Sequence, residues 1–297
     1  MFKNRPWNVY YTLGLLNVHC GAVAALFFRP QAVDLALGVG GYLWFGFAST
    51  LLYHRSLTHR SYDLWLPLKL FLLLGGLIGL SGDPIRWAAT HRYHHQRPDR
   101  DDDIHSPRDG WWYAHSGWLA RMDMKQMEKI LPLAADLARV PYLRIWQNRV
   151  LEVLPHLLYT ALLVAWRGPR GVYWGLYIPV VLTFHFTWMS VASFCHMPGL
   201  GSRRSNTPDA SRNVWWLGLP SLGESYHNNH HASPRRARHG QARWDLDPTG
   251  LLVWLLERAG LARNVFWDRP RGDDVLPEEL PEGVMQLQSV GEQDGPG

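Results

Sequence analysis

The sequence predicts an all-α membrane protein in which four transmembrane helices support a helical cap on one side of the membrane. Three observations lead to this prediction. Four long apolar stretches carry almost no charged side chains, and about 20 such residues suffice to cross a bilayer. Three clusters of histidines lie outside these stretches. If all four stretches cross, every cluster falls on the same side, so that the cap can hold a dinuclear metal site.

The four expected spans cover residues 9–28, 35–53, 150–166 and 172–195. The first stretch is long for a signal peptide, and a second apolar stretch follows almost at once, which favours a retained span. Residues 67–82 are also apolar, but they include Lys69 and only about eleven consecutive uncharged residues, too few to span. A crossing there would also separate the first two histidine clusters, so we expect a buried or interfacial helix.

The remaining residues form the expected cap, 54–149 and 196–271, within a single domain of residues 1–271. An acidic tail, 272–297, is expected to be disordered. The net charge of +5 suits either nucleic acid or a membrane surface, and the apolar stretches decide for membrane lipid and against nucleic acid. Most Lys and Arg residues fall on the cap side, which predicts a cytoplasmic active face.

Nine histidines are the candidate metal ligands. His91, His94 and His95 have the i, i+3, i+4 spacing that places three side chains on one helix face. The other candidates are His54, His59, His196, His227, His230 and His231. A zinc site takes three or four protein ligands, so nine suit a pair of ions. A carboxylate-rich di-iron bundle would need two Glu-x-x-His motifs, and only residues 224–227 fit. An all-histidine pair of irons is favoured, although imidazole also suits zinc and copper.

These motifs resemble those of the integral-membrane fatty acyl desaturases, in particular the stearoyl-CoA (Δ9) desaturase type. The resemblance rests on three boxes in order, HxxxxH at 54–59, HRxHH at 91–95 and HNxHH at 227–231. The flanking segments that agree are residues 87–90, 110–112, 117–119, 223–224 and 237–240. The likeness covers about residues 35–270, which is most of the chain.

The resemblance implies that the nine histidines bind two iron ions, with no catalytic residue beyond these ligands. The implied reaction uses O2 to introduce a cis double bond, expected at Δ9, into a saturated acyl thioester, expected to be an acyl-CoA held in a kinked tunnel. Because the chain has no flavin, iron–sulfur or cytochrome motif, a separate electron donor is expected, such as a ferredoxin, a rubredoxin or a cytochrome b5-like protein. The lack of a fused electron-donor domain and the short terminal segments favour a bacterial inner membrane.

One position departs from the family. In acyl-CoA desaturases an Asn four residues before the counterpart of His196 holds a metal-bound water, and this chain has Ala192 there. The departure keeps open a hydroxylase or an acetylenase on the same scaffold, and a non-redox zinc membrane protein is a further alternative. The candidate substrate contacts are Arg92, for a phosphate, and Trp87 and Trp188, for the acyl chain.

Six further histidines lie outside the boxes. Those within apolar stretches, His19, His156 and His185, are expected to serve packing or hydrogen bonding. The last of them stands eleven residues before the fourth-span ligand, roughly 16 Å along a helix, which is too far to join the site. The others, His105, His115 and His239, are expected to support ligands or lie at the surface. Residues 99–103 are expected to form a charged loop, with support of the ligand imidazoles as the alternative.

Overall fold

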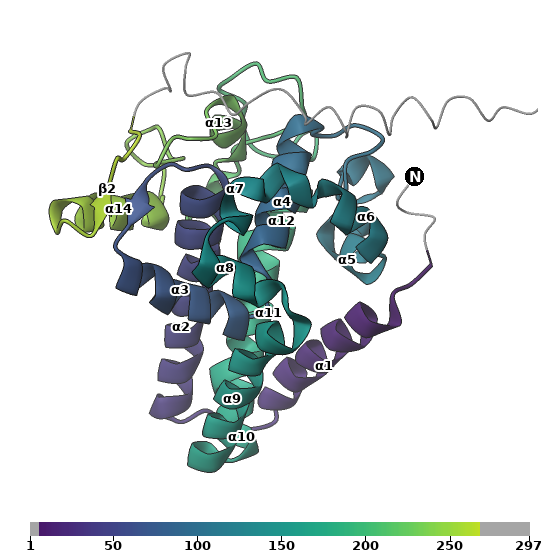
Figure 1. Cartoon of the computed structure of the whole chain (residues 1–297), viewed down its shortest axis with the longest axis vertical. Coiled ribbons are helices and arrows are strands. Elements are labelled where there is room, and N and C mark those ends of the chain that lie inside the picture. Colours follow the sequence, from purple (N-terminus) through teal and green to yellow (C-terminus); the bar gives the residue numbers. More distant parts are fainter. Residues whose placement is uncertain (1–5, 268–297) are drawn as a thin grey trace, which may run out of the picture.

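The computed structural model describes residues 6–267, so the predicted acidic tail lies outside the described residues. The described chain is mostly helical, as expected. Its one two-stranded sheet pairs β1 (Asp63–Leu64) with β2 (Ala262–Arg263) in antiparallel register. Long helices form a stem in the lower half of Figure 1, and shorter helices form a cap above it. We use the terms stem and cap in this sense throughout.

Three stretches of the stem are long and apolar enough to cross a membrane. They are Ala32–Thr58, Arg149–Arg167 and Pro169–Phe194. They correspond to the second, third and fourth expected spans. The first comprises α2 (Ala32–Phe47) and the π-helical segment η2 (Ala48–Thr58), and the second is α9 (Arg149–Arg167). The third comprises α10 (Pro169–Val172), η7 (Tyr173–Tyr177), α11 (Ile178–Thr183), η8 (Phe184–Met189) and α12 (Ser190–Phe194).

The first expected span is observed as α1 (Val9–Ala25), which is apolar but shorter than the other three. Its 17 residues extend about 26 Å, slightly less than the hydrocarbon thickness of a typical bilayer. The helix packs closely against the stem because Gly21 leaves room for Tyr177 of η7. A Cβ atom at that glycine would lie 1.9 Å from the tyrosine ring.

Residues 67–82 do not form a long helix, in agreement with the expectation that they do not span. They lie mostly in α3 (Leu66–Ile78), which has 13 residues and runs across the stem helices in Figure 1 rather than along them. One side of α3 packs on η2 and α9. The other side exposes apolar side chains, including Leu70, Phe71 and Leu74. An exposed apolar face of this kind suits a helix that lies at a membrane surface.

The cap is built around α4 (Pro84–Gln96), which packs on η2 of the stem. Its other α-helices are α5 (Trp118–Ala120), α6 (Met124–Ile130), α7 (Ala135–Ala138), α8 (Pro141–Arg144), α13 (His227–Ala232) and α14 (Pro248–Arg258). Its short 3-10 and π-helical segments are η3 (Pro107–Asp109), η4 (Tyr113–Gly117), η5 (Leu131–Ala134), η6 (Ile145–Gln147) and η9 (Trp215–Leu217). A buried apolar cluster extends from η2 through α3 and α4 to Val253 of α14, so cap and stem share one core.

The two short turns of the stem meet at the end opposite the cap (Figure 1). Asp34, at the start of α2, is fully buried there and accepts hydrogen bonds from Arg167 at 3.0 Å and from Arg170 at 2.6 Å. The latter arginine also donates to the carbonyl oxygen of Arg29. The turn after α1 and the turn after α9 are therefore tied together at the end far from the cap.

Candidate metal centre

The first histidine box lies on η2, whose π-helical geometry explains its spacing. Residues five apart on an α-helix point about 140° away from each other. In η2 the hydrogen bonds run from residue i to residue i+5, and the His59 N–H donates to the His54 carbonyl oxygen at 3.2 Å. The wider turn brings the two imidazole rings to the same side, with their centroids 4.9 Å apart.

The second box lies on α4, which has a well-defined start. Asp83 caps the helix by accepting hydrogen bonds from the backbone N–H groups of Ile85 and Arg86, and Pro84 occupies the first helical position. The histidines of the box project from the last turns of this helix. They lie on one face, as the spacing predicts, and this face points toward η2 and α13.

The third box lies on α13, a helix of six residues that needs support from its surroundings. The two asparagines between its histidines provide that support. The Asn228 side chain accepts from the backbone N–H of Arg204 at 2.8 Å, and the Asn229 side chain donates to the carbonyl oxygen of His239 at 2.8 Å. Because the asparagines hold the helix to the protein, the histidines are available for the centre.

All nine candidate ligands come together, and they form two adjoining groups. The five-His group comprises His54, His59, His91, His95 and His230. The four-His group comprises His94, His196, His227 and His231. Within each group the facing side-chain nitrogens lie within 4.8 Å of one another. Both α4 and α13 contribute to both groups, which explains why the groups adjoin.

The imidazole nitrogens of each group have the arrangement that a metal ion requires. Nε2 of His230 lies 3.1 Å from Nε2 of His54 and 2.9 Å from Nε2 of His95. In the four-His group, Nε2 of His231 lies 3.0 Å from Nε2 of His227. Ligands about 2.1 Å from an ion lie about 3.0 Å apart at right angles and about 3.4 Å apart in a tetrahedron. The observed spacings are therefore short enough for the nitrogens of each group to share one ion.

Unpartnered nitrogens support the same conclusion. Nε2 of His94 and Nε2 of His196 are buried and have no hydrogen-bond partner, although both rings are otherwise well held. The two ring nitrogens of His59 are likewise buried without a partner. Buried polar atoms are nearly always satisfied in folded proteins, so nitrogens left unpartnered at one place indicate a missing ligand, here a cation.

Carboxylates hold several ligand rings in place from behind. Nδ1 of each of these rings faces a carboxylate oxygen, so that its Nε2 lone pair points into the centre. The pairs are His94 with Asp103 at 3.0 Å, His196 with Asp99 at 2.9 Å, His231 with Asp209 at 3.0 Å and His54 with Glu224 at 2.5 Å. The alternative reading of the 99–103 loop, as support for the ligands, therefore describes the structure better than a charged surface loop.

The same contacts shift the acid–base properties of the carboxyl groups. Burial alone would raise their pKa values, but hydrogen bonds and charges from the ligand imidazoles hold the pKa of Asp99, Asp103 and Asp209 below the usual range. The pKa of Glu224 is held well below its usual range, against burial, chiefly by Arg55 and His54. All four groups are therefore carboxylates at neutral pH and accept hydrogen bonds.

Enclosure in the protein keeps most of the ligand imidazoles neutral. Burial, reinforced by neighbouring imidazoles, lowers the pKa of His59, His91, His95, His227 and His230 well below the ordinary value. A metal ion binds only the neutral ring, so these groups need not lose a proton at pH 7.

The three predicted substrate contacts lie close to the centre or beside the stem. Trp87 stacks on His91, with centroids 5.2 Å apart, and the Trp188 indole N–H donates to the Ser49 hydroxyl. Arg92 is buried, and its five N–H groups all donate within the protein. The acceptors are the carbonyl oxygens of Leu57, Thr58 and Leu133 and both carboxylate oxygens of Asp136. Substrate contact by these three residues stays a prediction.

Ala192 is buried on α12, one turn before His196. Its neighbour Ser193 does not replace the missing amide, because the serine hydroxyl faces the Met189 carbonyl oxygen at 2.6 Å and the His115 ring at 2.9 Å. The four-His group therefore receives no side-chain donor from position 192.

Four histidines outside the boxes take part in hydrogen bonds in the stem or at its border with the cap. His19, His185 and His115 form a chain in which successive ring nitrogens lie 3.0 Å apart, and the last ring meets the hydroxyl of Ser193. His156 lies 2.8 Å from the carbonyl oxygen of Ile78. These contacts connect η8 to α1 and to η4 of the cap, and α9 to α3. For His19, His156 and His185 this agrees with the expected packing and hydrogen-bonding role.

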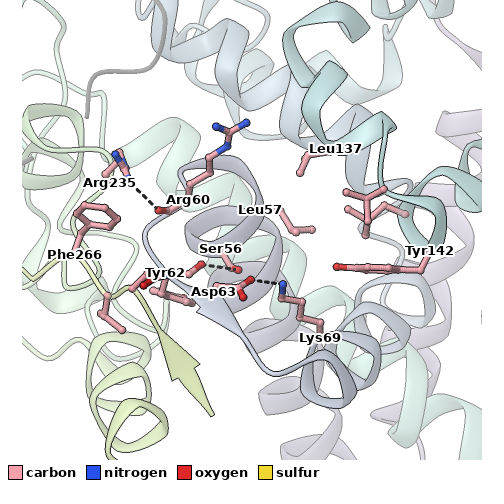
Figure 2. Close-up of a pocket in the computed structure, with 14 residues that line it drawn as sticks. Ser56, Leu57, Arg60, Tyr62, Asp63, Lys69, Leu137, Tyr142, Arg235 and Phe266 are labelled. Atoms are coloured by element: carbon pink, nitrogen blue, oxygen red, sulfur yellow. Dashed lines mark hydrogen bonds and ion pairs between the residues drawn. The ribbon is translucent and has the colours of Figure 1, made fainter. Parts of the chain in front are cut away.

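A pocket of about 680 Å³ opens beside the first box (Figure 2). Ser56 and Leu57, which lie between the two histidines of that box, form part of its wall. Apolar side chains from α7, α8 and the segment after β2 line it together with Arg60, Arg235 and the ion pair between Lys69 and Asp63. A lining of this kind suits a ligand that combines apolar and anionic parts.

Sequence reasoning missed some of the residues that matter here. Asp209 carried no signal, because it stands in a polar segment far from any box in the sequence. Glu224 enters the sequence argument only through the Glu-x-x-His spacing and its place before the third box, and the sequence assigns no role to Arg55. Their roles depend on which segments meet in space. Spacing along the chain could not show this.

Comparison with known proteins identifies the family. Residues 30–248 match the family model described as fatty acid desaturase. Over 267 residues the chain is 41% identical to Delta-9 acyl-lipid desaturase 1 of Arabidopsis thaliana, covering 88% of this chain and 85% of the relative. It is 40% identical to the acyl-CoA C20 Delta5-desaturase of Anemone leveillei, covering 74% and 69% of the two chains. It is also 40% identical to the probable lipid desaturase ADS3.2, chloroplastic, of Arabidopsis thaliana, covering 74% of this chain and 60% of that relative. The chain therefore belongs to the fatty acid desaturase family.

Proposed function

We propose that this protein is an O2-dependent desaturase that introduces a cis double bond, at Δ9, into a saturated fatty acyl chain. The observation that carries the proposal is the convergence of nine imidazoles in two adjoining groups of five and four. A mid-chain methylene has no acidic proton, so a side chain acting as general base cannot begin the reaction. Two iron ions, when bound, would supply the one-electron O2 chemistry that such a bond requires.

The residues of the chain have three tasks in this proposal. The two histidine groups bind the ions, and the four carboxylates behind them hold the rings in the orientation that presents Nε2. Trp87, stacked on His91, and Trp188 in the stem would contact the acyl chain and exclude water from it. The depth of the acyl chain relative to the histidines would then decide the position of the double bond.

For the head group we propose an acyl thioester, with acyl-CoA as the form to test first. The names of the relatives include both acyl-lipid and acyl-CoA desaturases, so family membership does not choose between them. The excess of basic residues in the chain supports an anionic head group. Isolated membranes supplied with labelled stearoyl-CoA, or with the same acyl chain in a glycerolipid, would separate the two substrates.

We further propose that α1 is a fourth span, that residues 1–271 form one domain, and that the centre faces the cytoplasm of a bacterial inner membrane. Support comes from the apolar composition of α1, its close packing on the stem and the position of both turns opposite the cap. A separate donor, such as a ferredoxin, a rubredoxin or a cytochrome b5-like protein, would deliver the electrons. The basic character of the chain suits an acidic donor.

Expression in a desaturase-deficient host, followed by fatty-acid profiling, tests the proposal. A desaturase yields an acyl chain that has lost two hydrogen atoms, and the position of the double bond follows from fragmentation. An unchanged profile, with full-length protein present in the membrane and a donor supplied, would contradict the proposal.

The same profile tests the alternative that Ala192 supports. A hydroxylase on this scaffold would yield an acyl chain that has gained one oxygen atom, and an acetylenase would remove hydrogen from an existing double bond. Metal analysis of the purified protein tests the non-redox alternative, which predicts bound zinc and no O2 consumption.

A further inference from the structure

The carboxylates behind the ligand rings are distributed unequally over the two histidine groups. In the four-His group, three of the four rings donate from Nδ1 to a carboxylate, at distances of 2.9 or 3.0 Å. In the five-His group, only His54 has a carboxylate at Nδ1, namely Glu224. Nδ1 of His59 and Nδ1 of His230 have no partner.

The charge of these carboxylates is also compensated unequally. Arg55 is fully buried and pairs with Glu224 at 3.0 Å and with Asp247 at 2.9 Å, so a guanidinium offsets part of the carboxylate charge beside the five-His group. In the four-His group, the other donors to the carboxylates are backbone N–H groups and a hydroxyl. Asp99 accepts from Ala210, Asp103 accepts from the Asp99 backbone, and Asp209 accepts from Thr207 and Ser211. No lysine or arginine of the described residues pairs with these three carboxylates.

This asymmetry has a direct consequence for a bound ion. An imidazole that donates from Nδ1 to a carboxylate is a more basic ligand at Nε2, and a more basic ligand stabilises the higher charge on a metal. Uncompensated carboxylates nearby act in the same direction through their charge, and burial strengthens that effect. All three carboxylates are at most 9% exposed. The four-His position should therefore favour the ferric state more than the five-His position does.

We propose that the iron held by the four-His group is oxidised before the iron held by the five-His group, because Asp99, Asp103 and Asp209 stabilise its higher charge. This inference rests on the proposed function insofar as it requires iron at both positions. It assigns different roles to the two ions. Iron at the four-His group would lose the first electron, and iron at the five-His group, where Arg55 offsets part of the carboxylate charge, would lose the second.

Two single-ligand variants of the full-length protein test the order. His59→Ala weakens the five-His position and His227→Ala weakens the four-His position, so that a single equivalent of iron binds at the unaltered group. These residues are a matched pair, because Nδ1 of each ring has no hydrogen-bond partner. Neither substitution therefore leaves a carboxylate unpaired. Each variant is loaded with iron-57 and titrated electrochemically, with the ferrous and ferric fractions read by Mössbauer spectroscopy. We expect the iron of His59→Ala to be oxidised at a lower potential than the iron of His227→Ala. Equal potentials, or the reverse order, would overturn the inference.

A charge-matched comparison identifies the cause. Asp103→Asn removes the carboxylate that His94 donates to, whereas Asp101→Asn removes the same charge from the same loop at a fully exposed side chain. Combined with His59→Ala, Asp103→Asn should raise the potential of the remaining iron, and Asp101→Asn should leave it unchanged. If both variants shift it equally, or neither does, the assignment to the hydrogen-bonded carboxylate is wrong.

The unaltered protein provides a second measurement if a single-ligand variant loses both ions. Its oxidation should then proceed in two steps, with Asp103→Asn displacing only the first step. A single concerted step in both proteins, or displacement of the second step, would overturn the inference. Failure of the proposed function is distinguishable, because it would appear as an absence of bound iron and of desaturated product, whereas failure of this inference leaves both intact.

Discussion

Arg55 connects the first histidine box to the region around the third box. It is fully buried, and its guanidinium donates to Glu224 at 3.0 Å, to both carboxylate oxygens of Asp247 and to the carbonyl oxygen of Ala237 at 2.7 Å. A buried guanidinium of this kind is compensated only while all its partners remain. Arg55 therefore stabilises the packing of the cap as well as the metal centre beside it.

Replacement of this guanidinium should unfold the cap more easily. Arg55→Met keeps much of the side-chain length but leaves two buried carboxylates without their cation, which typically costs about 3–5 kcal/mol of unfolding free energy. The matched control is Arg60→Met, because Arg60 pairs with Asp136 from a half-exposed position, where an ion pair contributes about 0–1 kcal/mol. Thermal unfolding in detergent measures both. Equal losses of stability in the two variants would contradict the structural role of Arg55.

His230 is the ligand whose loss should disrupt the five-His group most. Its Nε2 contacts the nitrogens of two other ligands, one from each of the other boxes. We expect His230→Ala to lower the bound iron and to reduce desaturation by roughly 100-fold or more. His94→Ala should have the same effect in the other group. Metal analysis and product profiling measure the two effects. His156→Ala, a histidine of α9 outside both groups, is the control that should keep its iron; full activity of His230→Ala without iron would refute the metal role.

At the residue scale, short-range spacing was enough to find the ligands but not their partners. The helical spacing of the second box, the place of His196 after the fourth span and the resemblance together predict the ligands, and the structure brings all nine together. The carboxylates Asp209 and Glu224 were not predicted as partners, because each meets its imidazole through a fold of the chain that sequence spacing does not encode.

At the element scale, the stem helices were predictable and the detail of η2 was not. The apolar stretches indicate three of the long helices within a few residues, and the short uncharged run within residues 67–82 agrees with the short α3. The i, i+5 spacing of the first box suits a π-helix, but a box of two histidines cannot distinguish this from a loop. The hydrogen bond from His59 to His54 settles the geometry only once the fold is known.

The packing of α1 on the stem can be tested by two glycines of the same helix. Gly14 has nothing within 4 Å of where a Cβ would lie, whereas a Cβ at Gly21 would collide with the ring of Tyr177. Gly14→Ala should be neutral or stabilising by up to about 1 kcal/mol, because alanine favours a helix. Gly21→Ala should lose about 1–3 kcal/mol, since the helix must move away from η7. Equal stability of the two variants, measured by thermal unfolding in detergent, would show that α1 does not pack as described.

At the scale of the whole molecule, the histidine groups and the stem turns lie at opposite ends. Asp34 pairs with Arg167 and Arg170 at the end of the turns, so the positive charges there are partly neutralised within the protein. The cap carries many more basic residues, including Arg204, Arg235 and Arg243. Loops rich in Lys and Arg tend to stay on the cytoplasmic side of a membrane, which supports the proposed cytoplasmic position of the cap.

Two single-cysteine variants test this orientation. Arg29 and Gln241 are exposed positions, one in the turn after α1 and the other in the cap. In a background with the exposed Cys20 replaced by Ser, the buried Cys195 should not react. A membrane-impermeant maleimide applied to intact cells should label Arg29→Cys at once, and Gln241→Cys only after the membrane is opened. We expect this labelling pattern because the two positions lie at opposite ends of helices long enough to cross the hydrocarbon layer. Labelling of both positions from the same side would contradict the four-span arrangement, and labelling of Gln241→Cys alone in intact cells would place the histidine groups outside the cytoplasm.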